Sequence, residues 1–357
     1  MWESPAPSVE ATKPRFDAAA ASRYLDGRMT SWMNATPQVG NNFACAMTCH
    51  TALPFAASRS ALGAGDEAAM ALGAHLDVRV HSVAHWKDAI PFYGARGSDT
   101  ARKSLGSEAV LNAAAEALLA ANGVEKAASV QPAMERMWEA QRADGGFDWL
   151  DFGLAPWENG DEIIGASFAA RAVGALPPAV RGHYEEQTAR LSAFVRGRLF
   201  EDPDGAAPVL RQSVSLFAAA SVLEVSASLD DLLSAQQKRV VADALVRAAS
   251  SDGGYSWSGL RVVPARDARG ASSDALPTAI AALALRASPS DSTEQAATKA
   301  KEWLAGRQAA DGSFPSRSPN RDRPFSHLVM TDAATAYAAL ALASLAEGRE
   351  RLRNTAQ

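Results

Sequence analysis

The stretch Gln141–Trp149, QRADGGFDW, indicates how the rest of the chain is organised. It reads as a polar turn built on an Asp-Gly pair and a second glycine, followed by aromatic side chains. Two later stretches repeat the pattern, SSDGGYSW at 250–257 and RQAADGSF at 307–314, and EDPDGAAP at 201–208 is a weaker copy. A unit that recurs at intervals of tens of residues is typical of repeat architectures.

Sequence segments with the pattern of α-helices flank each of these turns. The segment before a turn is amphipathic, as in QQKRVVADALVRAAS at 236–250, and the segment after it is almost uncharged, as in SDALPTAIAALALRA at 273–287. An amphipathic helix keeps one solvated face, whereas a helix that is apolar all round must be buried. The alternation predicts an all-α fold, an α/α toroid of helical hairpins with inner and outer helix rings.

The domain organisation follows from the same patterns. We expect residues 1–16 to be a flexible N-terminal lead and residues 17–350 to form a single toroid domain, which begins with a hairpin at 17–63. Asp161, Asp274 and Asp332 stand where inner helices should start, and carboxylates favour helix N-termini.

Composition excludes several classes of partner. The formal net charge is -5 and the sequence pI is about 5.8, so the chain lacks the basic surface that nucleic-acid binding requires. No apolar run reaches the ~20 residues of a membrane span. The first residues, MWESPAPSVEATKPRF, lack the features of an export signal, so the chain as written suggests the cytoplasm unless a signal has been removed.

The turns resemble the QW repeats of the squalene-hopene cyclase and prenyltransferase-like α/α-toroid superfamily, over about residues 130–345. The matching residues are Gln141, Gly145, Gly146, Phe147 and Trp149, and in part Gln308, Gly312 and Phe314. The third turn departs from the pattern, because Ala249 stands in the place of the glutamine. The chain has neither the D-x-D-D acid nor the D-D-x-x-D metal site of terpene cyclases, which makes cyclase chemistry the weaker interpretation.

Both cysteines lie in one short segment, NNFACAMTCHTALPF at 41–55. Cys45, Cys49 and His50 resemble a c-type haem attachment site, which has the form C-x-x-C-H, with one extra residue between the thiols. Two other interpretations remain open. If the segment is helical, the two Cα atoms are about 6 Å apart, within disulfide range, and the thiols could equally be unpaired.

The sequence on either side of these residues strengthens the haem interpretation. WMNATPQVGNNFACAMTCHTALPFAASRSAL at 32–62 and PWENGDEIIGASFAARAVG at 156–174 resemble a subgroup of secreted toroid-like proteins. That resemblance implies a covalent haem c on Cys45 and Cys49 with His50 as an iron ligand. It also implies a periplasmic or secreted location and a signal peptide removed from the chain.

Other residues are candidates around such a haem. Arg59 is the candidate partner of a haem propionate, and His327 and Met330 are candidates for the second axial ligand. His81 and His85 have a metal-compatible spacing on a helix. The candidates for an aromatic cavity wall are Trp149, Trp157, Tyr255, Trp257 and Phe314.

The sequence therefore predicts a c-type haem protein on a cyclase-like toroid, with a redox role and a redox partner. The alternative is a cofactor-free toroid that binds an isoprenoid or another small apolar ligand, or acts as a terpene cyclase, with a disulfide between Cys45 and Cys49. A third possibility is a protein-interaction scaffold, for which no sequence feature argues.

Overall fold

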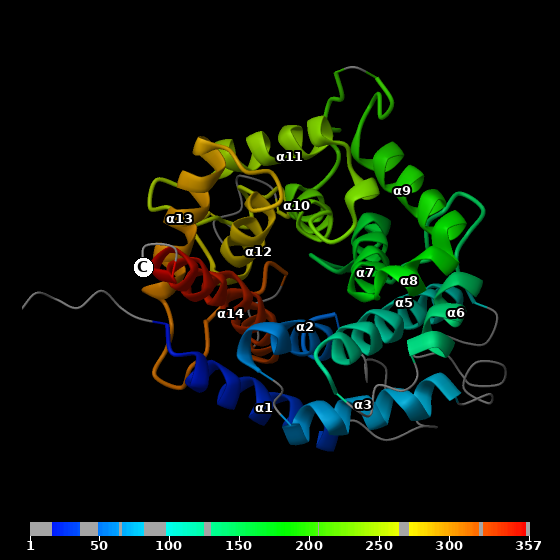
Figure 1. The fold of residues 1–357 in the computed structure, drawn as a ribbon, viewed down its shortest axis with the longest axis horizontal. Helices are drawn as coiled ribbons and strands as arrows, with labels where there is room; N and C mark the ends of the chain where they lie inside the picture. The colour runs from blue at the N-terminus through cyan, green and yellow to red at the C-terminus, as the bar shows by residue number, and fades with distance from the viewer. Residues whose placement is uncertain are drawn as a thin grey trace, which may run out of the picture.

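The helices form two concentric rings (Figure 1). The computed structural model describes residues 16–35, 49–63, 66–81, 98–124, 130–205, 207–263, 271–320 and 324–354. The inner ring consists of α2 (Ala52–Leu62), α5 (Asp99–Ala121), α7 (Glu162–Ala175), α10 (Leu216–Val225), α12 (Ala275–Leu285) and α14 (Pro324–Asn354). Each of these helices contacts the next one, and α14 contacts α2, so the inner ring is closed.

The outer ring covers the inner one. It consists of α1 (Ala18–Ala35), α3 (Asp66–His81), α6 (Val130–Glu139), α9 (Glu185–Leu199), α11 (Ala235–Ala248) and α13 (Asp291–Ala305). Short connections are α8 (Pro178–Arg181) and the 3-10 turns Gly182–Tyr184 and Asp230–Leu232. Strands β1 (Asp151–Leu154) and β2 (Glu158–Asn159) pair in an antiparallel hairpin just before α7. This architecture confirms the predicted all-α class and the α/α toroid.

The two rings differ in side-chain size and polarity. Every residue of α12 is buried, and alanine dominates the helix. In α11 the buried residues recur at helical spacing on one face, while charged residues occupy the other. Small side chains allow the inner helices to pack closely, and the outer helices keep a solvated face. None of the described helices combines the length and the apolarity that a membrane span needs.

The glutamine of each complete QW turn joins that turn to the next outer helix. The side-chain nitrogen of Gln141 donates to its own turn glycine and to the carbonyl of Gln187 at the start of α9, both at 3.0 Å. Gln308 repeats this arrangement with Asp17, just before α1, at 2.9 Å, and accepts from the Asp17 amide at 2.8 Å. The last turn is thereby joined to the first helix of the ring.

The third turn, which lacks the glutamine, is held differently. Asp252 accepts a hydrogen bond from the indole nitrogen of Trp303 at 2.9 Å and another from the hydroxyl of Ser273 at 2.8 Å. A carboxylate in the turn therefore takes over the bridging role when Ala249 replaces the glutamine.

Two features differ from the sequence expectations. Asp161 and Asp274 cap α7 and α12 as expected, but Asp332 lies inside α14, which begins at Pro324. The α3–α5 hairpin has no copy of the repeat turn in its sequence, and its connection, 82–97, lies outside the described residues. The two helices are present, but the sequence signal that marks the other hairpins is missing.

A polar stripe runs along α5 between the two rings. Glu108 pairs with Arg79 of α3 at 2.8 Å. Further along the stripe, Asn112 and Glu116 are buried, and within the described part of the chain neither the Asn112 amide nor the Glu116 carboxyl has a hydrogen-bond partner. Burial raises the pKa of Glu116 to about 8, with a smaller contribution from Asp77. This carboxyl is therefore protonated in the folded protein near neutral pH.

Replacing Gly312 by alanine should destabilise the ring at its point of closure. Gly312 has a φ of +90°, and a Cβ there would lie 2.3 Å from the carbonyl oxygen of Ala20 in α1. We expect a loss of roughly 2–4 kcal/mol in the free energy of unfolding, measured by urea denaturation. Gly123→Ala is the control: its φ is +77° and no atom lies within 4 Å, so the cost should be only about 1 kcal/mol. Equal costs for both changes would contradict the close-approach argument.

Glu116 should make stability fall as pH rises. Between about pH 4.5 and 8 the folded protein keeps the proton on Glu116 while the unfolded chain releases it, so the free energy of unfolding decreases through that window. Glu116→Gln should therefore gain roughly 2–4 kcal/mol over wild type between pH 5 and pH 8. The same change at the exposed Glu139 should leave the pH profile unaltered. Parallel pH profiles for wild type and Glu116→Gln would disprove the assignment.

Candidate active site

The inner helices begin at one end of the ring, where the turns from the outer helices enter. Their described N-caps are short polar residues: Ser98 for α5, Asp161 for α7, Ser215 for α10 and Asp274 for α12, each accepting a backbone hydrogen bond. Thr51 precedes α2. Helix N-termini carry partial positive charge, and connecting segments commonly carry function. This end of the ring, called here the open end, is where the candidate site lies.

A polar network at the open end joins α1, α2 and α14. The buried carboxylate of Asp332 accepts from Arg28 Nε at 2.8 Å and Arg28 Nη2 at 3.1 Å. It also accepts from Tyr24 Oη at 3.0 Å and from Thr51 Oγ1 at 3.1 Å. The Nδ1 atom of His50 lies 3.1 Å from Thr51 Oγ1. His50 is thereby connected to a carboxylate on the last helix of the chain.

Two indoles flank the His50 ring. The ring centroid of Trp32 lies 5.6 Å away in an edge-on arrangement, and that of Trp157 lies 6.3 Å away. Burial lowers the pKa of His50 to about 4, and the charge of Arg28 adds to the effect. The imidazole is therefore neutral at physiological pH.

Cys49 and Glu158 meet beside this histidine. Cys49 is buried, and its Sγ lies 3.8 Å from Glu158 Oε1. Burial raises the pKa of the Glu158 carboxyl, and its contact with Cys49 offsets only part of this effect. A carboxyl in this setting keeps a proton at higher pH than an exposed glutamate. Cys45 lies outside the described residues, and so does its predicted disulfide or thioether.

A cavity of about 280 Å³ lies beside the β-hairpin, against the starts of α7 and α10. Its lining residues are Pro156, Asn159, Gly160, Asp161, Ser213, Ser215, Arg261 and Val262. Burial raises the pKa of Asp161, and Glu162 adds to the shift. Two carboxyls with raised pKa values, Glu158 in β2 and Asp161 at the start of α7, therefore lie three residues apart.

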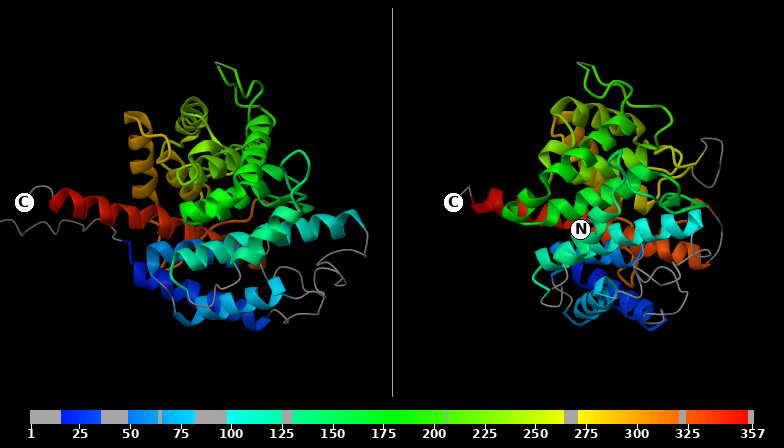
Figure 2. Two further views of the ribbon diagram at one scale, coloured as in Figure 1. Left: turned by 45° about the vertical axis from the view of Figure 1, so that its right-hand side comes forward. Right: turned by 90° about the vertical axis from the view of Figure 1, so that its right-hand side faces the viewer.

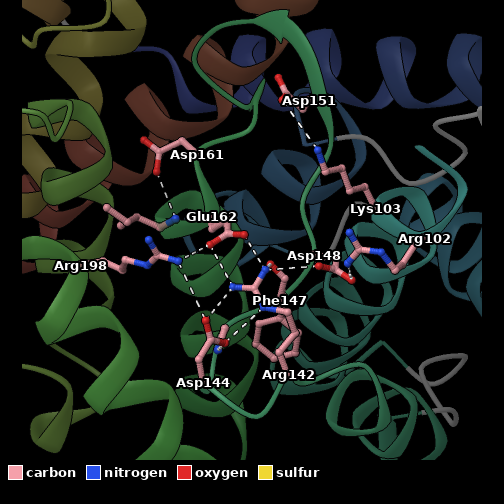
Figure 3. Close-up of polar contacts among 12 residues, drawn as sticks. Arg102, Lys103, Arg142, Asp144, Phe147, Asp148, Asp151, Asp161, Glu162 and Arg198 are labelled. Atoms are coloured by element: carbon pink, nitrogen blue, oxygen red, sulfur yellow. Dashed lines mark hydrogen bonds and ion pairs between the residues drawn. The ribbon is translucent and has the colours of Figure 1, made fainter. Parts of the chain in front are cut away.

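An ionic cluster fixes the start of α7 (Figure 3). Arg142 of the first QW turn bonds to Glu162 Oε2 at 2.9 Å and to Asp144 at 3.0 Å, and Arg198 of α9 reaches the same Glu162 oxygen at 2.9 Å. Glu162 directly follows Asp161, so the cluster also sets where the Asp161 side chain begins. The repeat turn thus contributes to positioning the candidate site.

Side chains cross the inside of the ring. Arg171 of α7 pairs with Glu224 of α10, and its guanidinium carbon lies 5.9 Å from the ring centroid of Tyr337 on α14. Helices α7 and α14 lie on opposite sides of the inner ring (Figure 1). Burial raises the pKa of Tyr337 to about 12. These residues occupy the interior beyond the open end.

Several residues predicted to surround a haem have other contacts in the described part of the chain. Arg59, the candidate propionate partner, is buried, pairs with Asp26 at 2.9 Å and stacks on Phe55 at 4.2 Å. The Nδ1 atom of His327 accepts from the Ser318 amide at 3.0 Å, and both His327 and Met330 lie inside α14 rather than before it. The His50 ring is flanked by two indoles.

Most of the predicted aromatic wall fills turns instead. Trp149 donates its indole proton to the carbonyl of Trp157, and Trp257 donates to that of Arg317 at 3.0 Å. Tyr255 and Phe314 are buried as well. A chain of ring contacts links His50, Trp157, Phe217 and Trp257, so Trp157 is the predicted aromatic that meets the predicted histidine.

Two functional candidates were missed in the sequence. Glu158 and the role of Asp332 became visible only in the structure, since Asp332 lies 281 residues from Thr51 along the chain. For Glu158 a signal existed: PWENGDE places a tryptophan, a glycine and several acidic groups before a buried helix. His81 bonds within its own helix to Asp77, and His85 lies outside the described residues.

Comparison with known proteins shows the fold. No protein-family model matches the chain, and no curated protein matches it in sequence. A wild-type glycosidase superposes with a TM-score of 0.57 at 16% identity, covering 95% of this chain and 99% of its own. A polysaccharide lyase gives 0.58 at 13% identity, covering 92% and 98%. The ent-copalyl diphosphate synthase of Streptomyces platensis gives 0.50 at 17% identity, and the match spans 83% of this chain but only 51% of that enzyme.

These neighbours correct the function predicted from the sequence. The predicted redox role as a c-type haem protein is wrong, because the structures similar over nearly the whole chain are glycosidases and a polysaccharide lyase. They do not support the alternative of a cofactor-free lipid-binding or cyclase-like toroid either. The misleading signal is local: the spacing of Cys45, Cys49 and His50 matches a cofactor site, whereas Trp157 and Glu158, which contact His50 and Cys49, lie more than 100 residues away in the chain.

Removing one partner of the internal ion pair should reveal how the ring interior is stabilised. Arg171→Met leaves the Glu224 carboxylate without its guanidinium, and we expect a loss of about 2–4 kcal/mol in the free energy of unfolding. The double variant Arg171→Met with Glu224→Met should recover most of that loss, because no charge is then left buried. Chemical denaturation of both variants checks this. A single variant as stable as wild type would contradict it.

Proposed function

We propose that this protein is a carbohydrate-processing enzyme that cleaves glycosidic bonds at the open end of the ring. The observation that carries the proposal is a pair of half-buried carboxyls with raised pKa values: Asp161, which lines the 280 Å³ cavity, and Glu158, in the β-hairpin next to the cavity residue Asn159. Both are held by the β-hairpin and the start of α7. The support from the comparisons is that a glycosidase and a polysaccharide lyase share the fold over more than nine tenths of the chain.

The chemistry of glycosidic cleavage needs a carboxyl that is still protonated at the working pH. That group donates a proton to the leaving oxygen, and a second group acts on the other side of the bond. Burial is the usual way in which an enzyme keeps a carboxyl protonated. Burial shifts the pKa of Glu158 upward, in the direction this role requires, and the carboxyl lies against Cys49, next to His50 in the chain; we assign Glu158 the role of general acid.

Asp161 is placed to act directly in the cavity. One of its carboxylate oxygens, Oδ1, accepts from the Ile163 amide at 3.1 Å, which fixes the side chain while the group lines the cavity wall. We assign it the second role, that of base or nucleophile. The neighbouring cavity residues Asn159, Ser213 and Ser215 are polar and can hydrogen-bond to sugar hydroxyls.

The size and walls of the site suit a sugar. Its volume is close to the lower end of the roughly 300–1,000 Å³ typical of small-molecule sites, so it accommodates one end of a saccharide chain. Its wall includes the polar side chains of Asn159, Ser213 and Arg261, which suit the hydroxyl groups of a saccharide. A polymeric substrate outside the cell agrees with the periplasmic or secreted location, which stays a prediction of the sequence.

The test is product release from a panel of oligosaccharides, including uncharged and uronate-containing ones, measured by mass spectrometry. Glu158→Gln and Asp161→Asn should each lower kcat by about 10²- to 10⁴-fold on the substrate that is cleaved. Both changes keep the side-chain size, and asparagine also caps helices well, so folding should be preserved. The control is Asp204→Asn in an exposed repeat turn, which should retain full activity.

Two outcomes would overturn the proposal. One is that the folded wild-type protein releases no product from any member of the panel. The other is that Glu158→Gln and Asp161→Asn, with helical circular dichroism and melting temperature unchanged, cleave as fast as Asp204→Asn.

A further inference from the structure

We propose that Asp332, acting through the hydroxyl of Thr51, is a positioning residue that keeps the His50 proton on Nδ1 and leaves Nε2 as a hydrogen-bond acceptor for a substrate hydroxyl. The naming of the substrate group rests on the proposed function. The control of the tautomer does not, and it can be tested by itself.

The direction of each hydrogen bond follows from what its partners can do. Arg28 can only donate, and it donates to both oxygens of Asp332, at 2.8 and 3.1 Å. Asp332 therefore acts as an acceptor toward Thr51 Oγ1, 3.1 Å away. A threonine hydroxyl has a single hydrogen, so once it is directed to Asp332 the oxygen can only accept from His50 Nδ1, at 3.1 Å. The neutral imidazole must then carry its hydrogen on Nδ1.

The other ring nitrogen is left available. Nε2 of His50 makes no hydrogen bond within the described part of the chain, and the residue is only half-buried. Because burial keeps the ring neutral, Nε2 has a free lone pair rather than a proton. A neutral imidazole acceptor selects a donor, and a sugar hydroxyl packed near Trp157 is a donor of that kind.

Asp332, at the end of this chain of hydrogen bonds, is held by several contacts. Asp332 is buried, and Arg28, Tyr24 and Thr51 hold it from α1 and from the start of α2. The hydrogen bonds from Asp332 through Thr51 to His50 therefore connect the contact between α1 and α14 to the start of α2. A third group that orients a base through an intermediate is the general logic of catalytic triads.

The decisive experiment is a long-range ¹H–¹⁵N spectrum of the histidine side chains in the full chain at neutral pH, with His50→Gln used to assign the His50 signals. Wild type should show the Nδ1–H tautomer. Asp332→Asn replaces one carboxylate oxygen by a donor: in the orientation that turns the amide nitrogen to Thr51, the Thr51 hydroxyl donates to Nδ1 and His50 shifts toward Nε2–H. Thr51→Val should give a mixture of tautomers, and Thr51→Ser should restore the wild-type spectrum.

Two results would overturn the inference: a wild-type His50 with its proton on Nε2, or an unchanged tautomer in both Asp332→Asn and Thr51→Val. If Asp332→Asn does not fold, the Thr51 variants decide the question, because they leave the Arg28–Asp332 pair in place.

Activity separates this inference from the proposed function. On a cleaved saccharide, Thr51→Val should lower kcat/KM by about five- to tenfold, the loss of one hydrogen bond to substrate, while Thr51→Ser stays near wild type. The expected tautomer shift without any saccharide cleavage would reject the proposed function and leave the positioning role standing. Cleavage with a tautomer that does not respond would reject the positioning role alone.

Discussion

The ion pair between Arg28 on α1 and Asp332 on α14 is the contact on which both the ring and its candidate site depend. It joins the first hairpin to the last and buries a carboxylate that Tyr24 and Thr51 also use. A buried charge is tolerated only when its hydrogen-bonding capacity is met, which explains why three helices converge on this one group. The same carboxylate, that of Asp332, therefore both closes the ring and orients His50 through Thr51.

Burial has two different effects in this fold. In the inner helices it removes alanine-rich surface from water and closes the ring, as α12 illustrates, where every residue is buried. At the open end it removes carboxyls from water, which is unfavourable for their charged forms. Glu158 and Asp161 carry that cost, and the ionic cluster around Arg142 and Glu162 keeps their segment in place (Figure 3). Contacts in the surrounding scaffold thus offset the unfavourable free energy of removing these two carboxyls from water.

Much of the architecture was predictable, because it follows from local rules. The turn at 141–149 and its copies indicated the repeat, and the alternation of amphipathic and apolar helices indicated the two rings. The C-terminal end of α14 projects beyond the other helices (Figure 2). Prediction failed where the local signal was absent or ambiguous. The α3–α5 hairpin has no marked turn, and Asp332 was expected to cap a helix because an aspartate before an apolar run is typical of an N-cap. Its carboxylate binds Arg28 instead.

The sequence by itself determined the class of fold, since hydrophobic periodicity and glycine turns act over a few residues. The tertiary structure decided what the polar residues do. His50 lies just before inner helix α2, but its connection to Asp332 through Thr51 depends on a residue hundreds of positions away. Arg59 pairs with Asp26, and burial raises the pKa of Glu158. The pKa values of these side chains and their hydrogen-bond partners depend on desolvation and on neighbours across the ring. The spacing of residues along the chain does not determine either of them.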